Sequence, residues 1–147
     1  MSSESYSKTY EVIWADMDPN NHMRHSVYND YAAQTRVAMF NDFGMPIPKI
    51  AAIGLGPILF KEETKFLKEI SLSEQITVSC AIKAMRKDAA RWTITHNIFK
   101  EDGQKAAQII VDGAWLDLQK RKLGIPPKEL LEASMKFPRT DDFFWID

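Results

Sequence analysis

The chain has 147 residues, of which 45% are hydrophobic and 27% charged, so it is long enough to bury a core without metals or disulfides. Its formal net charge of −1 argues against a nucleic-acid-binding protein, although local basic clusters can still hold a small phosphorylated ligand. The single cysteine, Cys80, excludes an intrachain disulfide, and no stretch has the roughly 18 to 20 apolar residues that span a bilayer.

The N-terminal segment is polar and lacks the apolar core of a signal peptide. With the one cysteine, this predicts a cytoplasmic protein. We find no linker, internal repeat or low-complexity tract, and therefore predict a single domain over residues 1–147.

The first elements are a strand, a turn and a long helix. Alternating apolar residues predict a strand over 6–14, and Pro19 with the two asparagines after it predicts a turn. Ser26 is a candidate helix cap. Between Tyr28 and Met39, residues suited to a buried face recur every three or four positions, which predicts a helix. Gly44 and Pro46 are expected to end it.

Residues 45–59 are apolar but rich in proline and glycine, with a short helix predicted near 47–53. Two interpretations stay open. The segment is a connection that packs on the core, or Ile47, Ile50 and Leu55 form the wall of an apolar ligand pocket.

The rest of the chain is mostly strand. Alternation predicts strands near 58–66, 76–83, 92–98 and 105–118, with Asp102-Gly103 as a hairpin turn. Short connections favour antiparallel neighbours, so we expect a meander of these four strands. After them we expect a short helix at 127–134 and an aromatic tail, which is a docked flap or a partner contact. Docking is favoured because its aromatic side chains are costly to leave in water.

One long helix and about five antiparallel strands bury each other only if the sheet curls around the helix. The sequence therefore predicts an α+β protein with one long central helix wrapped by a curved antiparallel sheet.

The residues with catalytic chemistry lie at the turn before the long helix. Asp18, Asn20 and His22 alternate there, and a helix N-terminus offers unpaired N–H groups and the positive end of its dipole. Asp18 is a candidate nucleophile or general base, Asn20 can orient a water, and His22 can pass a proton. The backbone amide of His25, rather than its ring, is a candidate oxyanion donor. The alternative is that Asp18 and Asn20 only cap a turn.

Other reactive side chains are weaker candidates. Cys80 and His96 lie on apolar strand stripes and are interpreted as core residues, His96 alternatively as an interface residue. Glu62 and Glu63 are possible second carboxylates, of which one must face the inner side of the sheet. The histidine spacing does not suit a metal. Phosphate-binding, dinucleotide and nucleophile-elbow glycine motifs are absent.

The segment WADMDPNNHMRHSVYNDY resembles the start of the hotdog-fold acyl thioesterases. Residues 14–19 resemble the 4-hydroxybenzoyl-CoA type, in which the aspartate before proline is catalytic, here Asp18. Residues 18–23, with Tyr28 following, resemble the acyl-carrier-protein type, in which Asp, Asn and His alternate. The later segments EDGQKAAQ, at 101–108, and VDGAWLDLQKRKLGIPP, at 111–127, resemble the family's last hairpin and closing strand.

This resemblance implies a hotdog fold and a homodimer or homotetramer with sites at the subunit interface. It also implies a CoA or acyl-carrier-protein thioester as substrate, with no metal and no cofactor other than the coenzyme A of the substrate. One departure is Arg24-His25, where the family often has two asparagines; a backbone donor at His25 survives that change.

We therefore predict thioester hydrolysis, with Asp18, Asn20, His22 and His25 as the catalytic residues. The predicted substrate-binding residues are Tyr28, Glu63, Arg86, Lys87 and Arg91. The last three cluster at one hairpin and are candidates for the phosphates of coenzyme A, with a solvated turn as the alternative.

Two other functions stay open. One is a hotdog acyl-CoA hydratase or dehydratase, whose histidine lies five residues after the aspartate with proline following asparagine; here the spacing is four and proline comes first. The other is a non-catalytic acyl-thioester-binding protein in which Asp18 only caps the turn.

Overall fold

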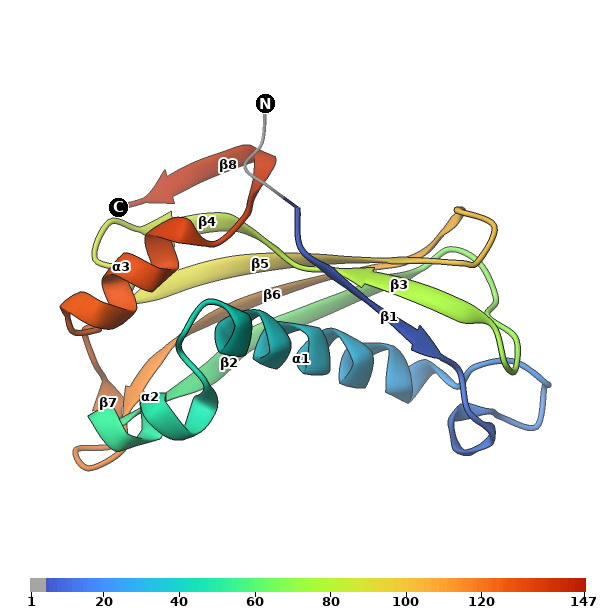
Figure 1. Cartoon of the computed structure of the whole chain (residues 1–147), viewed down its shortest axis with the longest axis horizontal. Coiled ribbons are helices and arrows are strands. Elements are labelled where there is room, and N and C mark those ends of the chain that lie inside the picture. Colours follow the sequence, from blue (N-terminus) through green and yellow to red (C-terminus); the bar gives the residue numbers. More distant parts are fainter. Residues whose placement is uncertain (1–4) are drawn as a thin grey trace.

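The computed structural model describes residues 5–147, and Figure 1 shows one long helix running along one face of a curved sheet. The helices are α1 (His25–Asp42), α2 (Ile47–Ile53) and α3 (Lys128–Lys136), with a short 3-10 helix, η1, at Trp14–Asp16. The strands are β1 (Ser7–Glu11), β2 (Leu55–Phe66), β3 (Gln75–Ser79), β4 (Ala81–Arg86), β5 (Arg91–Phe99), β6 (Lys105–Asp117), β7 (Lys122–Leu123) and β8 (Arg139–Ile146). The predicted arrangement of one long helix against a curved, mainly antiparallel sheet is confirmed.

The sheet is built around β5 and β6. β3 and β4 follow one another along the same edge of β5, interrupted at Cys80, and β6 lies between β5 and β2. β1 pairs with β3, and β8 continues that outer edge by pairing in parallel with β4. The meander prediction was wrong for β2, which pairs with β6 and not with β3, because residues 67–74 cross the end of the sheet.

Two predictions for the segment that leads into α1 differ from the structure. The first strand ends at Glu11 and not at residue 14, because Asp16 donates its backbone N–H to the Ile13 carbonyl, 3.0 Å away, in the η1 turn. Ser26 is not the helix cap. α1 begins at His25 with Arg24 as its N-cap and no capping side chain, while the Ser26 hydroxyl accepts a hydrogen bond from the Arg24 guanidinium.

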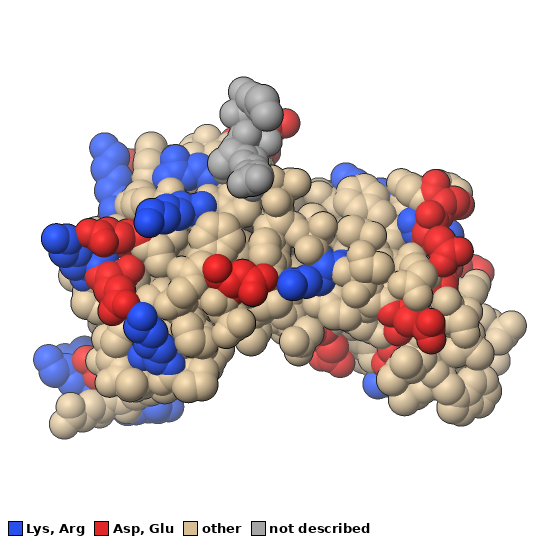
Figure 2. All heavy atoms as spheres, in the orientation of Figure 1, with Lys and Arg blue, Asp and Glu red and all other residues tan. Residues whose placement is uncertain are grey.

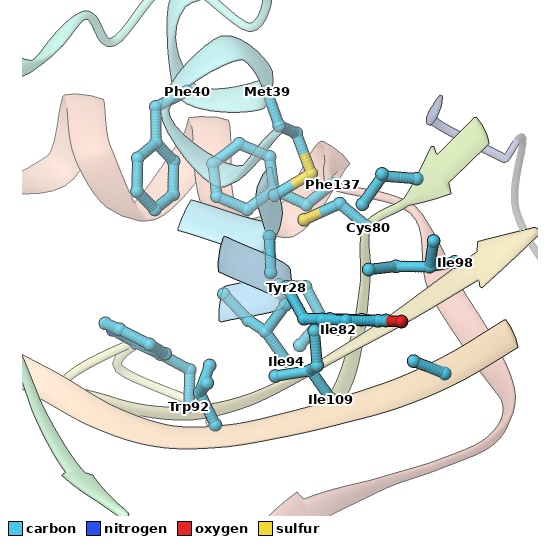
Figure 3. Close-up of a cluster of buried hydrophobic side chains, with 14 of the residues drawn as sticks. Tyr28, Met39, Phe40, Cys80, Ile82, Trp92, Ile94, Ile98, Ile109 and Phe137 are labelled. Carbon is cyan, nitrogen blue, oxygen red and sulfur yellow. The ribbon is translucent and has the colours of Figure 1, made fainter. Parts of the chain in front are cut away.

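The core lies between α1 and the sheet (Figure 3). Ile50 is fully buried in it and Leu55 nearly so, which supports the core-packing interpretation of residues 45–59. Cys80 is also fully buried, as predicted, and burial raises the pKa of its thiol to about 12. The side chains of α1 that are buried are Val27, Tyr28, Ala32, Thr35, Arg36, Met39 and Phe40.

A polar pair crosses this core. His96 is fully buried; its Nδ1 donates to the Ser79 carbonyl at 2.9 Å, and its Nε2 accepts from the Arg36 guanidinium at 3.0 Å. Burial, and then the Arg36 charge, lowers the pKa of His96 to about 3. Burial also lowers the pKa of Arg36. The interpretation of His96 as a core residue is confirmed.

The aromatic tail is docked, as favoured, and forms β8 at the edge of β4. The Arg139 guanidinium lies over the rings of Phe143 and Trp145, at 4.3 and 4.9 Å from their centroids, and partly shields these rings from water. Within residues 5–147, no helix combines the length and the apolar character that a membrane crossing requires.

Candidate active site

The turn between η1 and α1 is a small hairpin that brings Asp18 and His22 opposite each other. Met17 and Met23 form an antiparallel bridge, and the Asp18 amide donates to the His22 carbonyl at 3.0 Å. Asn21 occupies the left-handed region with φ of 66°, a conformation that asparagine tolerates better than most residues. The Met23 amide donates to the Ile70 carbonyl at 2.7 Å, which ties this hairpin to the connection after β2.

A cleft of about 370 Å³ opens beside this hairpin, within the usual size range of small-molecule sites. It lies between the hairpin, the first turn of α1 and the end of β2. We call it the Asp18 cleft; its lining residues are Asp18, His22, Met23, His25, Tyr28, Phe66, Leu67, Lys68 and Glu69.

Asp18 and His22 are in direct contact in this cleft. Asp18 Oδ1 accepts the backbone N–H of Asn20 at 2.9 Å and that of His22 at 3.4 Å, which is the geometry of an Asx turn. Asp18 Oδ2 lies 3.3 Å from His22 Nδ1, and the two side chains are 20% and 31% exposed. Asp18 therefore both caps the turn and lines the cleft.

The N-terminus of α1 borders the same cleft. His25 is the first helical residue. The Arg24 amide before it donates to the Asp16 carbonyl, and the Val27 amide donates to the Arg24 carbonyl. Within residues 5–147, no protein acceptor is bonded to the amides of His25 or Ser26. Two donors at the positive end of the helix dipole are thus available to a developing oxyanion.

Tyr28 forms the inner wall. Its side chain is 4% exposed and meets the Phe66 ring edge to face, with centroids 5.0 Å apart. Burial raises the pKa of the phenol, and the nearby carboxylates of Glu69 and Asp18 raise it further. The hydroxyl therefore stays protonated and can donate a hydrogen bond to a ligand in the cleft.

Two other predicted site residues lie outside the cleft. The Asn20 side chain is exposed and does not line it. Of the two glutamates on β2, Glu62 is the one that faces α1, where its carboxylate accepts from Asn29 at 2.8 Å. Glu63 alternates with it, on the other face of the strand, and is not among the lining residues.

The three basic candidates lie at the far end of the sheet. Arg86 and Arg91 line a second cleft, of about 340 Å³, together with Phe60. Phe60 precedes Phe66 by six residues on β2, so the two clefts are roughly 20 Å apart along the strand. Arg86 pairs with Asp88 at 2.9 Å, and Arg91 lies over the Phe60 ring. Lys87 is exposed and does not line this second cleft.

Sequence reasoning missed the wall of the Asp18 cleft formed by residues 66–69. These residues carry no motif, and their only signal is that a strand ends where the long helix begins. Lys68 and Glu69 add a cation and a second carboxylate to the cleft. Among the described residues, no group of three or more His, Cys, Asp or Glu side chains is arranged to hold a metal ion.

On the face shown in Figure 2, charge is distributed unevenly between the two ends of the molecule. Figure 2 shows acidic side chains gathered at the end formed by the β2–β3 and β5–β6 connections, with Lys and Arg more numerous at the opposite end. The acidic residues of these connections are Glu69, Glu74, Glu101 and Asp102. On this face the acidic connections lie at the end of the molecule opposite the β4–β5 hairpin, which carries Arg86 and Arg91.

Comparison with protein families gives a match over residues 12–134 to the thioesterase-like superfamily. The chain belongs to this superfamily. A search of curated protein sequences finds no match.

Solved structures show how this thioesterase-like chain is folded. It superposes on a hypothetical protein of Staphylococcus aureus, solved in complex with CoA, with a TM-score of 0.84 and 21% identity, covering 92% of this chain and 84% of the other. It superposes on a 1,4-dihydroxy-2-naphthoyl-CoA thioesterase of Synechocystis with a TM-score of 0.79 and 16% identity, covering 88% and 95%. A DHNA-CoA thioesterase of S. aureus gives a TM-score of 0.83 and 16% identity, covering 90% and 89%. The hotdog fold predicted from the sequence is confirmed.

Proposed function

We propose that this protein hydrolyses an acyl-CoA thioester to a free acid and coenzyme A. The observation that carries the proposal is that Asp18, His22 and the first residue of α1 line one cleft. A carboxylate and an imidazole there face unpaired amides at a helix N-terminus, which is the combination that attack on a carbonyl requires. The similar solved structures include a CoA thioesterase and a protein in complex with CoA, which supports the same substrate class.

In this proposal the thioester carbonyl points at the amide of His25. One such donor typically contributes about 2.7 to 4 kcal/mol to stabilising the transition state. Asp18 acts as nucleophile or general base, and His22 assists. Tyr28 and the end of β2 hold the acyl group, which is consistent with their apolar contact. Asn20, with its exposed side chain, contributes its backbone N–H to the Asp18 carboxylate.

We propose that Arg86, Lys87 and Arg91 bind the phosphates of coenzyme A. Two guanidinium groups beside one cleft suit a phosphate. Because they lie roughly 20 Å from the Asp18 cleft along β2, the coenzyme must extend along this strand, or the two clefts must come from different subunits.

We also propose a homo-oligomer, a dimer or a tetramer. β2 is an edge strand whose only described partner is β6. It exposes Leu59, Phe60 and Phe66 to between 42% and 53%. An open, apolar edge is the kind of strand that proteins cover with another chain. A cytoplasmic location, where thiols stay reduced, suits a chain with one cysteine.

The test is an assay of thiol release from a panel of acyl-CoA and acyl-pantetheine substrates of differing acyl length, aliphatic and aromatic. Stoichiometric release of thiol and acid supports hydrolysis. Consumption of an unsaturated acyl-CoA without thiol release identifies a hydratase, and tight binding without turnover identifies a binding protein; both outcomes reject the proposal.

A further inference from the structure

Both oxygens of the Asp18 carboxylate already have partners in the turn. Oδ1 accepts two backbone N–H groups of its own turn, and Oδ2 faces His22 Nδ1 at 3.3 Å. Hydrogen bonds and a neighbouring donor stabilise the carboxylate as it stands, which makes it a poorer nucleophile. The geometry of Asp18 is that of a group that holds another side chain.

The imidazole of His22 is held in one tautomer. Nδ1 faces the Asp18 carboxylate and, at 3.5 Å, the Met23 carbonyl. Both are acceptors only, so in the neutral ring Nδ1 carries the hydrogen. Nε2 then bears the lone pair, and no protein donor is bonded to it in residues 5–147.

We propose that His22 is the general base of the hydrolysis and that Asp18 is its positioning residue. This inference rests on the proposed function and refines it, because it replaces attack by Asp18 with attack by water. The arrangement follows the logic by which an aspartate orients a catalytic histidine in other hydrolases. Here the two side chains come from one five-residue segment, residues 18–22.

The step balances without a further reactant. A water between His22 Nε2 and the thioester attacks the carbonyl carbon while Nε2 takes its proton. The C–O bond forms and the oxyanion is held by the amides at the start of α1. Collapse of the intermediate breaks the C–S bond, and the proton on Nε2 passes to the leaving thiolate. The products are the acid and the thiol.

Glu69 is the rival base, because it is the other carboxylate that lines the cleft. It lies on the β2–β3 connection and is exposed, and no ion pair joins it to a histidine in residues 5–147. Glu69→Gln preserves its shape without its basicity. Under our proposal Glu69→Gln lowers kcat less than His22→Ala does and keeps the dependence on His22, whereas a larger loss for Glu69→Gln than for His22→Ala overturns the proposal.

The first experiment locates the attacking oxygen. Enzyme in excess over acyl-CoA is allowed one turnover in ¹⁸O-labelled water, quenched, and both the acid and the peptide that contains Asp18 are analysed by mass spectrometry. We expect one ¹⁸O in every molecule of acid and none in the peptide. An acyl adduct on the protein, or ¹⁸O in Asp18, overturns the proposal.

The second experiment removes the base and restores it. We expect His22→Ala to lower kcat by about 10² to 10⁴, and added imidazoles to restore turnover in proportion to their basicity. A merely structural histidine gives no such dependence. His96→Gln is the matched control, since this core histidine is outside the cleft and imidazoles should not affect its variant. The proposal is overturned if the restored turnover does not depend on the basicity of the added imidazole, or if His22→Ala is as active as wild type.

The third experiment tests whether Asp18 acts through His22. If it does, Asp18→Asn in the His22→Ala background lowers kcat no further, whereas an independent nucleophile adds its full loss. Additive losses overturn the proposal. These results are distinct from failure of the proposed function, because the latter is the absence of thiol release by the wild-type protein, whatever the route of attack.

Discussion

His96 Nε2 lies 3.0 Å from the Arg36 guanidinium in the core, so protonation of this histidine places two cations in contact away from water. In the unfolded chain the histidine pKa is about 6.5, whereas in the folded protein burial and Arg36 lower it to about 3. Between these values the unfolded state binds a proton that the folded state does not, so the free energy of unfolding falls as the pH falls.

We expect this linkage to cost about 2 kcal/mol of stability between pH 7 and pH 5. Urea unfolding at the two pH values measures it. His96→Gln, which keeps polar atoms but cannot titrate, should lose the corresponding part of the pH dependence. If the variant and the wild type show the same change between pH 7 and pH 5, the buried neutral histidine is refuted.

The thiol of Cys80 should be inert in the folded protein. Because burial raises its pKa to about 12, its thiolate fraction near pH 8 is on the order of 10⁻⁴. We expect reaction with a disulfide reagent to be about 10³-fold slower in buffer than in denaturant. Rapid labelling without denaturant would contradict the buried site. A slow reaction also means that thiol-release assays carry little background from the enzyme.

Much of the fold was readable from periodicity and turn chemistry. The Pro19-Asn20-Asn21 turn, the long helix and the Asp102-Gly103 hairpin follow from local residue types, since Asn21 and Gly103 both adopt positive φ. The partner of β2 was not readable. Alternation indicates which face of a strand is buried, but not which strand lies beside it.

The candidate site was predicted only where its residues are neighbours in sequence. Asp18, His22 and His25 lie in one turn, so their meeting follows from local geometry. Lys68 and Glu69 reach the cleft because residues 67–74 cross the end of the sheet. That placement depends on tertiary structure and not on local sequence. Glu63 does not line the cleft, and alternation along β2 alone could not indicate which of Glu62 and Glu63 faces the helix.

Gly113 should not tolerate a side chain. A Cβ there lies 2.3 Å from the Trp92 ring and 2.6 Å from the Ile58 carbonyl, and the backbone atom cannot move aside cheaply. We expect Gly113→Ala to lower the free energy of unfolding by about 3 kcal/mol. Gly56→Ala is the control, because its Cβ meets only the end of the Leu118 side chain, and should cost less than about 1 kcal/mol. Equal effects in denaturant melts would show that the close approach at Gly113 is not real.

Arg91 tests the proposed phosphate contacts. Loss of a charge-assisted hydrogen bond is worth about 1.5 to 3 kcal/mol, so we expect Arg91→Ala to raise KM for acyl-CoA about tenfold or more. KM for the corresponding acyl-pantetheine, which has no nucleotide, should not change. Lys128→Ala, at a side chain 87% exposed on α3, is the control. A rise of the same size with both substrates argues for a structural role, and no rise with either rejects the assignment.

The most direct measurement is thiol release by the wild-type protein and by Asp18→Asn, across one panel of acyl-CoA substrates. The carboxylate faces His22 Nδ1 at 3.3 Å, and the amide of the variant would turn a donor or a neutral oxygen toward that ring. We expect the variant to melt as the wild type does, to bind acyl-CoA, and to lose about 10²-fold or more in kcat. Thiol release by Asp18→Asn at the wild-type rate would contradict the assignment of this cleft as the catalytic site.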